Sequence, residues 1–276
     1  MTPIDQQTIL VTGATDGLGK QVALSLARDG AALILHGRDR GRCERTLRDI
    51  RDQTGNERLS YQLADFSALD DVRALAKAVD TTYERLDVLV NNAGVGGGDQ
   101  SDLRRQISRD GYELRFAVNY LAPFLLTALL RPLLERSAPA RIVNVASVGQ
   151  HEIDFADVML ERAYDSTRAY RQSKLAQIMF TISLAERLEG TGVTVNAVHP
   201  ATLMDTKMVH EWFGHTQSTV AEGRDATLRL IRDPALDGVT GRYFDRQREG
   251  RARAQAYDRI ARERLWTLSE ELTGLQ

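Results

Sequence analysis

Tyr170 and Lys174 are the pair of side chains in this sequence best suited to moving a proton, because they stand four positions apart. On one helix this spacing places both side chains on the same face. A free phenol has a pKa of about 10, and a neighbouring ammonium group lowers it by favouring the phenolate. The pair therefore predicts a general acid or base with a lowered pKa. Alone, such a pair is more often a solvated helix face.

Ser147 and Asn119 have positions that suit the same chemistry. Ser147 directly follows an apolar run, and Asn119 lies in a long apolar segment. If that run is a parallel strand, Ser147 lies at its carboxyl end, where its hydroxyl can bind a substrate oxygen. Either residue alone has a plain structural role, as a helix cap or as the partner of a buried carbonyl. The combination of Tyr170, Lys174 and Ser147 predicts acid–base chemistry at a carbonyl or alcohol oxygen.

A glycine-rich turn precedes the first expected helix, with the sequence Thr12-Gly13-Ala14-Thr15-Asp16-Gly17-Leu18-Gly19. Glycines let the backbone turn sharply and approach a pyrophosphate, and the helix N-terminus offers unpaired N–H groups to the anion. A purely structural turn is the alternative interpretation, and the position after the first expected strand argues against it. We expect a dinucleotide phosphate site formed by Gly13, Thr15, Asp16, Gly17, Leu18 and Gly19.

Short apolar runs alternate with longer amphipathic segments along the chain. Several runs are apolar on both faces, which is typical of parallel strands buried between two layers of helices. The sequence predicts strands at 8–11, 32–36, 59–63, 86–90, 141–146, 193–197 and 242–244, with helices between them and a helix at the C-terminus. The expected architecture is α/β: a doubly wound parallel sheet (Rossmann fold), forming a single domain over residues 1–276. The mixed segment 201–215 is the expected substrate lid.

Arg38 follows the second expected strand, where a dinucleotide fold meets the adenosine ribose. A cationic side chain there suits a 2′-phosphate, whereas an acidic one suits a free 2′-hydroxyl. The sequence therefore favours NADP(H) over NAD(H). Asp39 could instead accept the ribose hydroxyl, so NAD(H) is also possible.

The composition excludes several classes of function. A formal net charge of -2 over 276 residues gives no general attraction for nucleic acid or an anionic membrane. The single cysteine, Cys43, excludes an intrachain disulfide and a cysteine metal cage, so we expect no metal centre and a cytoplasmic location. The N-terminus lacks the features of a secretory signal. The most apolar stretch, 117–134, contains Pro123 and Arg131, which predicts a buried helix and no membrane span.

The sequence resembles the short-chain dehydrogenase/reductase family over roughly Thr8 to Phe244. Besides the glycine turn, the matching pieces in order are Asn91-Asn92-Ala93-Gly94, Asn119, Ser147 and Tyr170-Arg171-Gln172-Ser173-Lys174. The regions 116–127, 170–188 and 266–274 look most like the retinol-dehydrogenase-like branch. Branch similarity alone does not establish retinoid chemistry.

This resemblance implies roles for individual residues. It implies a catalytic set of Asn119, Ser147, Tyr170 and Lys174, in which Asn119 stabilises a helix distortion and a water of a proton relay. Lys174 would also hold the nicotinamide ribose. The implied cofactor contacts beyond the glycine turn are Asp65, Phe66, Asn92, Ala93, Gly94, Tyr170, Lys174, Pro200 and Thr202. Thr206 is equally plausible in place of Thr202, and Pro200-Ala201 replaces the usual Pro-Gly pair.

Apolar side chains could line a substrate pocket, which predicts a hydrophobic carbonyl or alcohol compound as the small-molecule substrate. The candidates are Phe155, Met159, Met204, Met208, Trp212 and Phe213. Packing of a connecting segment onto the core is an equal alternative. His151 follows Ser147 by four positions, and we assign it no catalytic role.

Two helical regions, 116–134 and 173–188, are more apolar than one sheet face requires. In related folds such helices form a bundle between subunits, so the resemblance implies a homodimer or homotetramer, although the C-terminal tail could cover this surface instead. The leading interpretation is an NADPH-preferring carbonyl reductase or alcohol dehydrogenase with Tyr170 as its general acid/base. The alternatives are a catalytically silent dinucleotide-binding scaffold or regulator, and a sugar-nucleotide epimerase, whose larger substrate domain and glycine spacing are not visible.

Overall fold

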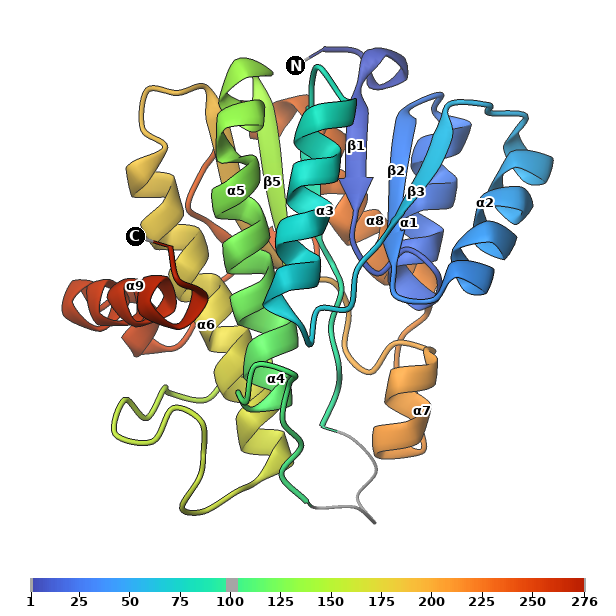
Figure 1. Ribbon diagram of the computed structural model, residues 1–276. Coiled ribbons are helices and arrows are strands. Elements are labelled where there is room, and N and C mark those ends of the chain that lie inside the picture. The colour runs from blue at the N-terminus through green and yellow to red at the C-terminus, as the bar shows by residue number, and fades with distance from the viewer. Residues whose placement is uncertain (1, 98–103, 276) are drawn as a thin grey trace.

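The computed structural model describes residues 2–97 and 104–275 (Figure 1). Its centre is an eight-stranded sheet in the order β3-β2-β1-β4-β5-β6-β7-β8. Neighbouring strands are parallel throughout except for β8, which is antiparallel to β7. The strands are β1 (Thr8–Val11), β2 (Ala32–Gly37), β3 (Leu59–Leu63), β4 (Val88–Asn91), β5 (Ala140–Val145), β6 (Val193–His199), β7 (Tyr243–Asp245) and β8 (Arg248–Glu249). This sheet confirms the predicted doubly wound fold.

Helices cover both faces of the sheet (Figure 1). One layer contains α1 (Gly17–Arg28), α2 (Arg40–Thr54) and α8 (Val220–Arg232), and the other contains α3 (Leu69–Thr82), α5 (Ala122–Arg136) and α6 (Ser166–Arg187). The remaining helices are α4 (Leu114–Phe116), α7 (Lys207–Phe213), α9 (Arg259–Thr273), the π-helix η2 (Ala117–Leu121) and the 3-10 turns η1 (Ile4–Gln6), η3 (Pro234–Leu236) and η4 (Ala254–Tyr257).

The strands are apolar on both faces because each face packs against a helix layer. Leu10 and Leu89 belong to one buried cluster, while Ile9, Val88 and Val90 belong to the other. Successive residues of a strand point to opposite faces, so a strand between two layers is largely apolar on both faces. This requirement explains why the continuous apolar runs of the sequence located the strands.

β8 is the strand that the sequence did not predict. It consists of two exposed charged residues, Arg248 and Glu249, which carry no apolar pattern. The predicted strand boundaries otherwise shift by one or two residues at their ends, as for β4, which begins at Val88. Such shifts leave the positions of the candidate site residues unchanged.

The C-terminal helix α9 packs across α5 and α6 (Figure 1). Its Trp266 ring lies 5.1 Å from the ring of Phe124 and 5.9 Å from that of Phe180. The Arg187 guanidinium stacks 3.8 Å from the Trp266 ring, and the Tyr120 hydroxyl hydrogen-bonds Ser269 at 2.7 Å. The tail therefore covers the α5 and α6 surface that the resemblance assigned to contact between subunits.

The most apolar helical stretch belongs to the core of the protein. Leu114–Arg136 has the length and composition of a membrane span, yet 78% of its apolar window is buried inside the folded chain. Neighbouring strands and helices already cover it, so its apolar character is explained by packing.

The carboxyl ends of the parallel strands meet at one edge, which faces downward in Figure 1. The helices α4 and α7 and the segment between β5 and α6 lie at this edge. In open α/β sheets ligands bind at the carboxyl ends of the strands. The candidate residues are therefore gathered at the edge where such a fold places its ligand.

Candidate active site

The glycine turn has no room for side chains at two of its positions. A Cβ on Gly13 would lie 2.8 Å from Cα of Ala93, and a Cβ on Gly19 would lie 2.3 Å from the Gly13 carbonyl oxygen. Gly13 also has a φ of 65°, a conformation that favours glycine. Asn92 fixes the turn, since its Nδ2 donates to the carbonyls of Thr12 and Gly13 at 2.8 and 3.2 Å. The turn is therefore a preformed backbone cradle.

The other residues of the turn support this cradle. Leu18 is buried under the turn, and Gly17 has a φ of 48°. Thr15 lies against Gly37, where a Cβ would be 2.7 Å from Thr15 Cγ2. Asp16 caps α1 by accepting the Gly17 N–H at 2.8 Å, and it pairs with Arg42 at 2.9 Å. All six predicted residues of the turn are thus placed together.

His36, which the sequence analysis missed, holds the turn from below. Its Nδ1 accepts the Gly13 N–H at 3.2 Å, and its Nε2 lies 3.1 Å from the Ala64 carbonyl. The ring stacks on Phe66, with centroids 4.3 Å apart. Burial lowers the pKa of His36 to about 4, so the ring is neutral at pH 7 and can accept that hydrogen bond. Phe66 thus supports the site through His36.

The adenosine end of the turn carries two charged candidates with different surroundings. Arg38 is exposed, and no hydrogen bond or ion pair engages it among the residues described here. Asp39 is occupied as the N-cap of α2, accepting the Arg42 N–H at 2.7 Å. Asp65 accepts the Ser67 N–H at 3.0 Å and pairs with Arg109 at 3.4 Å. Arg38 is thus available to contact the adenosine ribose or its phosphate, whereas the Asp39 carboxylate is already engaged as a helix cap.

Asn119 lies in a π-helical turn, as the resemblance implied. This turn, η2, separates α4 from α5. The Asn119 Oδ1 accepts the Val95 N–H at 2.7 Å, and its Nδ2 donates to the Val95 carbonyl and to Ser173 Oγ, each at 3.0 Å. Gly94 lies between Asn119 and Lys174, where a Cβ would be 3.1 Å from Oδ1 and 3.8 Å from Nζ. Asn119 therefore joins the strand β4 loop to helix α6.

Tyr170, Lys174 and Ser147 converge at the start of α6. The Lys174 Nζ lies 5.8 Å from the centre of the Tyr170 ring. Burial raises the pKa of the Tyr170 phenol, and its hydrogen bond with Ser147 offsets this only in part. Ser147 Oγ also accepts the Gly149 N–H at 3.0 Å. The serine and the tyrosine can therefore bind the same substrate oxygen.

Burial of both groups opposes the predicted lowering of the Tyr170 pKa by Lys174. Lys174 is itself buried, which lowers the pKa of its ammonium group to about 7. Its Nζ donates to the Val145 carbonyl and to Gln177 Oε1, each at 2.9 Å. Loss of water around the phenol raises its pKa by more than the hydrogen bond with Ser147 lowers it. The pKa of Tyr170 is therefore raised.

Gln177 is a second residue that the sequence analysis missed. It is 1% exposed and ends a buried polar chain. In that chain Asn91 donates to Asn144 Oδ1, Asn144 donates to Thr181 Oγ1, and Thr181 donates to the backbone carbonyl of Gln177, each at 2.8 Å. The positions of Lys174 and Gln177, three residues apart on one helix, were the available signal.

The segment after β6 separates the two threonine candidates. Thr202 Oγ1 lies 3.1 Å from His199 Nε2 and accepts from Arg246 at 3.2 Å. Thr206 lies against the glycine turn instead, with Cγ2 3.3 Å from the Cβ position of Gly17. Pro200 is buried, and the left-handed conformation falls on Leu203, with a φ of 44°. The geometry favours Thr206 over Thr202 as the group nearer the phosphate cradle.

The predicted apolar pocket residues are only partly brought together. Met208, Trp212 and Phe213 are on α7, and the Trp212 ring lies 4.9 Å from that of Tyr170. Met204 packs against Gly223. The Phe155 ring lies under the Arg264 guanidinium of α9, and the Met159 sulfur accepts the N–H of Glu113, which precedes α4. Both residues therefore contact elements other than α7. The His151 ring lies near its own neighbour, the Glu152 carbonyl, at 2.8 Å.

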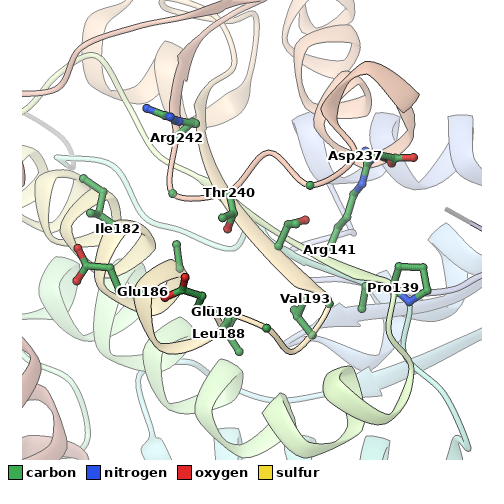
Figure 2. A pocket seen from close by; sticks show the side chains of 17 residues that line it. Pro139, Arg141, Ile182, Glu186, Leu188, Glu189, Val193, Asp237, Thr240 and Arg242 are labelled. Atoms are coloured by element: carbon green, nitrogen blue, oxygen red, sulfur yellow. Dashed lines mark hydrogen bonds and ion pairs between the residues drawn. The ribbon is translucent and has the colours of Figure 1, made fainter.

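A groove of about 650 Å³ lies at the opposite edge of the sheet (Figure 2). Its lining includes Pro139 and Ala140 before and at the start of β5, and Gly192 and Val193 at the start of β6. Figure 2 shows Glu186 and Glu189 on one side of it, away from Arg141 and Asp237. This groove is at the amino ends of the strands, so it is separate from the Tyr170 site.

The chain is similar to known oxidoreductases over nearly its whole length. Residues 7–217 match the short chain dehydrogenase family. The chain is 38% identical over 291 aligned positions to retinol dehydrogenase 13 of Mus musculus, covering 99% of this chain and 85% of that protein.

Two solved structures have the same fold. A short chain dehydrogenase from Salmonella enterica serovar Typhi is 30% identical, with a TM-score of 0.73 and coverage of 90% and 98% of the two chains. The Pseudomonas aeruginosa RhlG/NADP active-site complex is 26% identical, with a TM-score of 0.71 and coverage of 89% and 97%. The chain therefore belongs to the short-chain dehydrogenase family of oxidoreductases, which act on CH–OH and C=O groups with NAD(P).

Proposed function

We propose that this protein is an NADPH-preferring oxidoreductase that interconverts an apolar carbonyl compound and its alcohol, with Tyr170 as general acid/base. The observation that carries the proposal is the convergence of Tyr170, Ser147 and Lys174 beside a backbone cradle built for a dinucleotide. Proton transfer and phosphate binding are thereby combined at one edge of the sheet.

The cradle fits a nicotinamide dinucleotide. Gly13 and Gly19 leave the backbone uncovered where any side chain would collide, and the N-terminus of α1 is directed at this point. Asn92, Ala93, Gly94, Asp65 and Thr206 would complete the contacts along the nucleotide. Arg38 supports a preference for a 2′-phosphate because it is cationic and available, and a solved relative is an NADP complex.

Tyr170 would donate its proton to the carbonyl oxygen during reduction. Its raised pKa keeps the phenol protonated at neutral pH, as a general acid requires. Ser147 would hold the same oxygen by a hydrogen bond, and Lys174 would bind the nicotinamide ribose and stabilise the phenolate that remains. Asn119 keeps the β4 loop at the required distance from α6. When bound, the dinucleotide supplies or accepts the hydride.

The apolar side chains of α7 support an apolar substrate, as do relatives named retinol dehydrogenases. We propose that segment 201–215 is the lid of this substrate site within one domain. We also retain a cytoplasmic location without a membrane span as a proposal, supported by the buried state of the Leu114–Arg136 helix. Because α9 covers α5 and α6, a homodimer or homotetramer would have to use another surface.

The deciding experiment is a screen for NADPH oxidation with diverse aldehydes and ketones, repeated with Tyr170→Phe. The substitution should lower turnover by about 10²–10⁴-fold, because it removes the proton donor. Binding of NADPH, measured by fluorescence titration, should stay within about twofold. Near-wild-type turnover by Tyr170→Phe would remove Tyr170 from the mechanism. NADPH binding without turnover by the wild-type protein would favour the catalytically silent scaffold.

A further inference from the structure

Trp212 is the one buried residue of helix α7. Its side chain is 7% exposed, whereas its neighbours Glu211 and Phe213 are exposed. The indole is therefore the buried anchor of this seven-residue helix, and Met208, whose Cγ would lie 2.8 Å from a Cβ on Gly96, packs beside it on the same loop. The position of that anchor determines what α7 covers.

The indole lies on the backbone of two glycines in the loop after β4. A Cβ on Gly97 would meet Trp212 Cε2 at 2.3 Å and Cζ2 at 2.4 Å, and a Cβ on Gly96 would meet Cε3 at 3.4 Å. Neither glycine has a positive φ. These positions therefore need glycine for space and not for conformation. The indole therefore packs directly on the backbone of Gly96 and Gly97, which we call the glycine seat.

The seat is fixed by a buried cation. Arg115 is 2% exposed, and its Nε and Nη2 donate to the carbonyls of Gly96 and Gly97, each at 3.0 Å. Its Nη1 donates to the Tyr164 hydroxyl at 2.8 Å. A planar guanidinium that binds two successive carbonyls leaves the loop little freedom. The glycine seat is thus held in one conformation.

The same indole contacts the proposed proton donor. The rings of Trp212 and Tyr170 are 4.9 Å apart at an angle of 73°, an edge-to-face contact. A substrate carbonyl must come within hydrogen-bond distance of the Tyr170 hydroxyl. Groups attached next to the carbonyl carbon must therefore pass close to the indole.

We propose that Trp212, seated on Gly96 and Gly97, forms the wall beside Tyr170 that sets substrate shape. This wall admits carbonyl compounds that are unbranched next to the reacting carbon and excludes those that are branched there. The inference rests on the proposed function and deepens it, because it names the shape of the substrate. A rigid aromatic wall discriminates by steric exclusion, which differs from a general preference for apolar compounds.

The test compares straight-chain and α-branched aldehydes of equal carbon number, with NADPH as the reductant. The ratio of their kcat/KM values should favour the straight chain in the wild-type protein, and Trp212→Ala should reduce this ratio at least tenfold. Gly97→Ala should reduce it as well, because the added methyl group displaces the indole. Trp212→Phe should give an intermediate ratio. Lys207→Ala, an exposed position on the same helix, serves as the control and should leave the ratio unchanged.

A second measurement does not depend on turnover. The chain has two tryptophans, so Trp266→Phe leaves Trp212 as the single indole. Its emission should resist acrylamide quenching, and Gly97→Ala in the same background should make it more accessible.

The possible failures are distinguishable. An unchanged substrate ratio in Trp212→Ala, or a Trp212 emission as accessible as that of a free indole, would overturn the role of Trp212 and leave the proposed function standing. Absence of turnover by the wild-type protein on every aldehyde would overturn the proposed function and this inference together.

Discussion

Lys174 Nζ lies 2.9 Å from Gln177 Oε1, so the amine proposed to assist Tyr170 is held by an amide one helical turn away. Among the described residues, the amine makes one other hydrogen bond, to the Val145 carbonyl. Gln177 therefore sets both the direction of the lysine and part of the stabilisation of its charge.

Replacing Gln177 should move the pH dependence of the reaction. Gln177→Leu removes an acceptor that favours the charged amine, so the pKa of Lys174 should fall below about 7. Carbonyl reduction should then lose activity at a lower pH, with kcat/KM about tenfold lower at pH 7.5, which corresponds to one charge-assisted hydrogen bond. Gln177→Glu should shift the alkaline limb in the opposite direction. Identical pH profiles for both variants and the wild type would show that the contact has no influence on Lys174.

His36 should make the protein sensitive to acid. Its pKa is lowered from 6.5 to about 4 in the folded chain, so the unfolded chain binds more protons between these values. The stability contributed by neutral His36 is complete above pH 6.5 and is lost as the pH falls toward 4. The loss amounts to on the order of 3 kcal/mol.

Urea unfolding between pH 4 and 7 measures this effect. His36→Asn should flatten the dependence of unfolding free energy on pH, and exposed His215→Asn should not change it. Part of the slope should remain in His36→Asn, because burial also lowers the pKa of His199 to about 4. An equal slope in wild type and His36→Asn would contradict the assignment.

Arg115→Met should destabilise the fold strongly. The side chains of Arg115 and Glu113 are 3% and 1% exposed, so the substitution leaves a buried carboxylate without its cation. Breaking such a pair costs about 3–5 kcal/mol. The matched control is Arg131→Met, which removes a partly exposed pair with Glu135 and should cost less than about 1 kcal/mol. Equal unfolding free energies for Arg115→Met and Arg131→Met would show that the buried ion pair contributes no more to stability than the partly exposed one.

Trp266→Ala should expose the surface that α9 covers. Phe124 and Phe180 would lose their aromatic neighbour, and an uncovered apolar surface promotes association. Light scattering should therefore show a larger average mass for Trp266→Ala that rises with concentration. Ile260→Ala on the same helix, where the residue is 81% exposed, should behave like the wild type. If the wild type associates and Trp266→Ala associates to the same extent, the contact between subunits uses another surface.

Arg38→Ala should weaken the preference for NADPH. Loss of one charge-assisted contact with a 2′-phosphate costs about 1.5–3 kcal/mol, which is roughly 10–150-fold in kcat/KM. The value for NADH should change little. Arg40→Ala is the control, because the Arg40 guanidinium is engaged by the Tyr61 hydroxyl at 3.1 Å. An unchanged NADPH to NADH ratio in Arg38→Ala would remove Arg38 from cofactor selection.

The sequence was sufficient to predict seven of the eight strands and the convergence of the candidate residues Tyr170, Lys174 and Ser147. Buried parallel strands are largely apolar on both faces, so β1, β2 and β4 are visible as nearly continuous apolar runs. Tyr170 and Lys174 share a helix, and Ser147 follows a strand, so local patterns locate all three. These features depend on neighbours in the chain.

The remaining features depend on contacts between distant segments. His36 supports Gly13 across 23 positions, and Arg115 binds Gly97 across 18. Helix or strand periodicity cannot predict contacts between residues so far apart in the chain. The effect of burial on the pKa of Tyr170 was also not predictable, because spacing reveals a neighbouring charge but not how much water the fold removes from both groups.

The buried chain from Asn91 through Asn144 and Thr181 ends at the backbone carbonyl of Gln177, the residue whose side chain holds Lys174, and so connects the interior of the sheet with helix α6 beside the active site. A valine at position 144 would suit a strand, yet it would remove one acceptor of the Asn91 amide and the donor to the Thr181 hydroxyl. Substitutions that neighbouring core positions tolerate should therefore impair activity at position 144. In a library of random substitutions, clones altered at Asn144 would be soluble and inactive more often than clones altered at Val143.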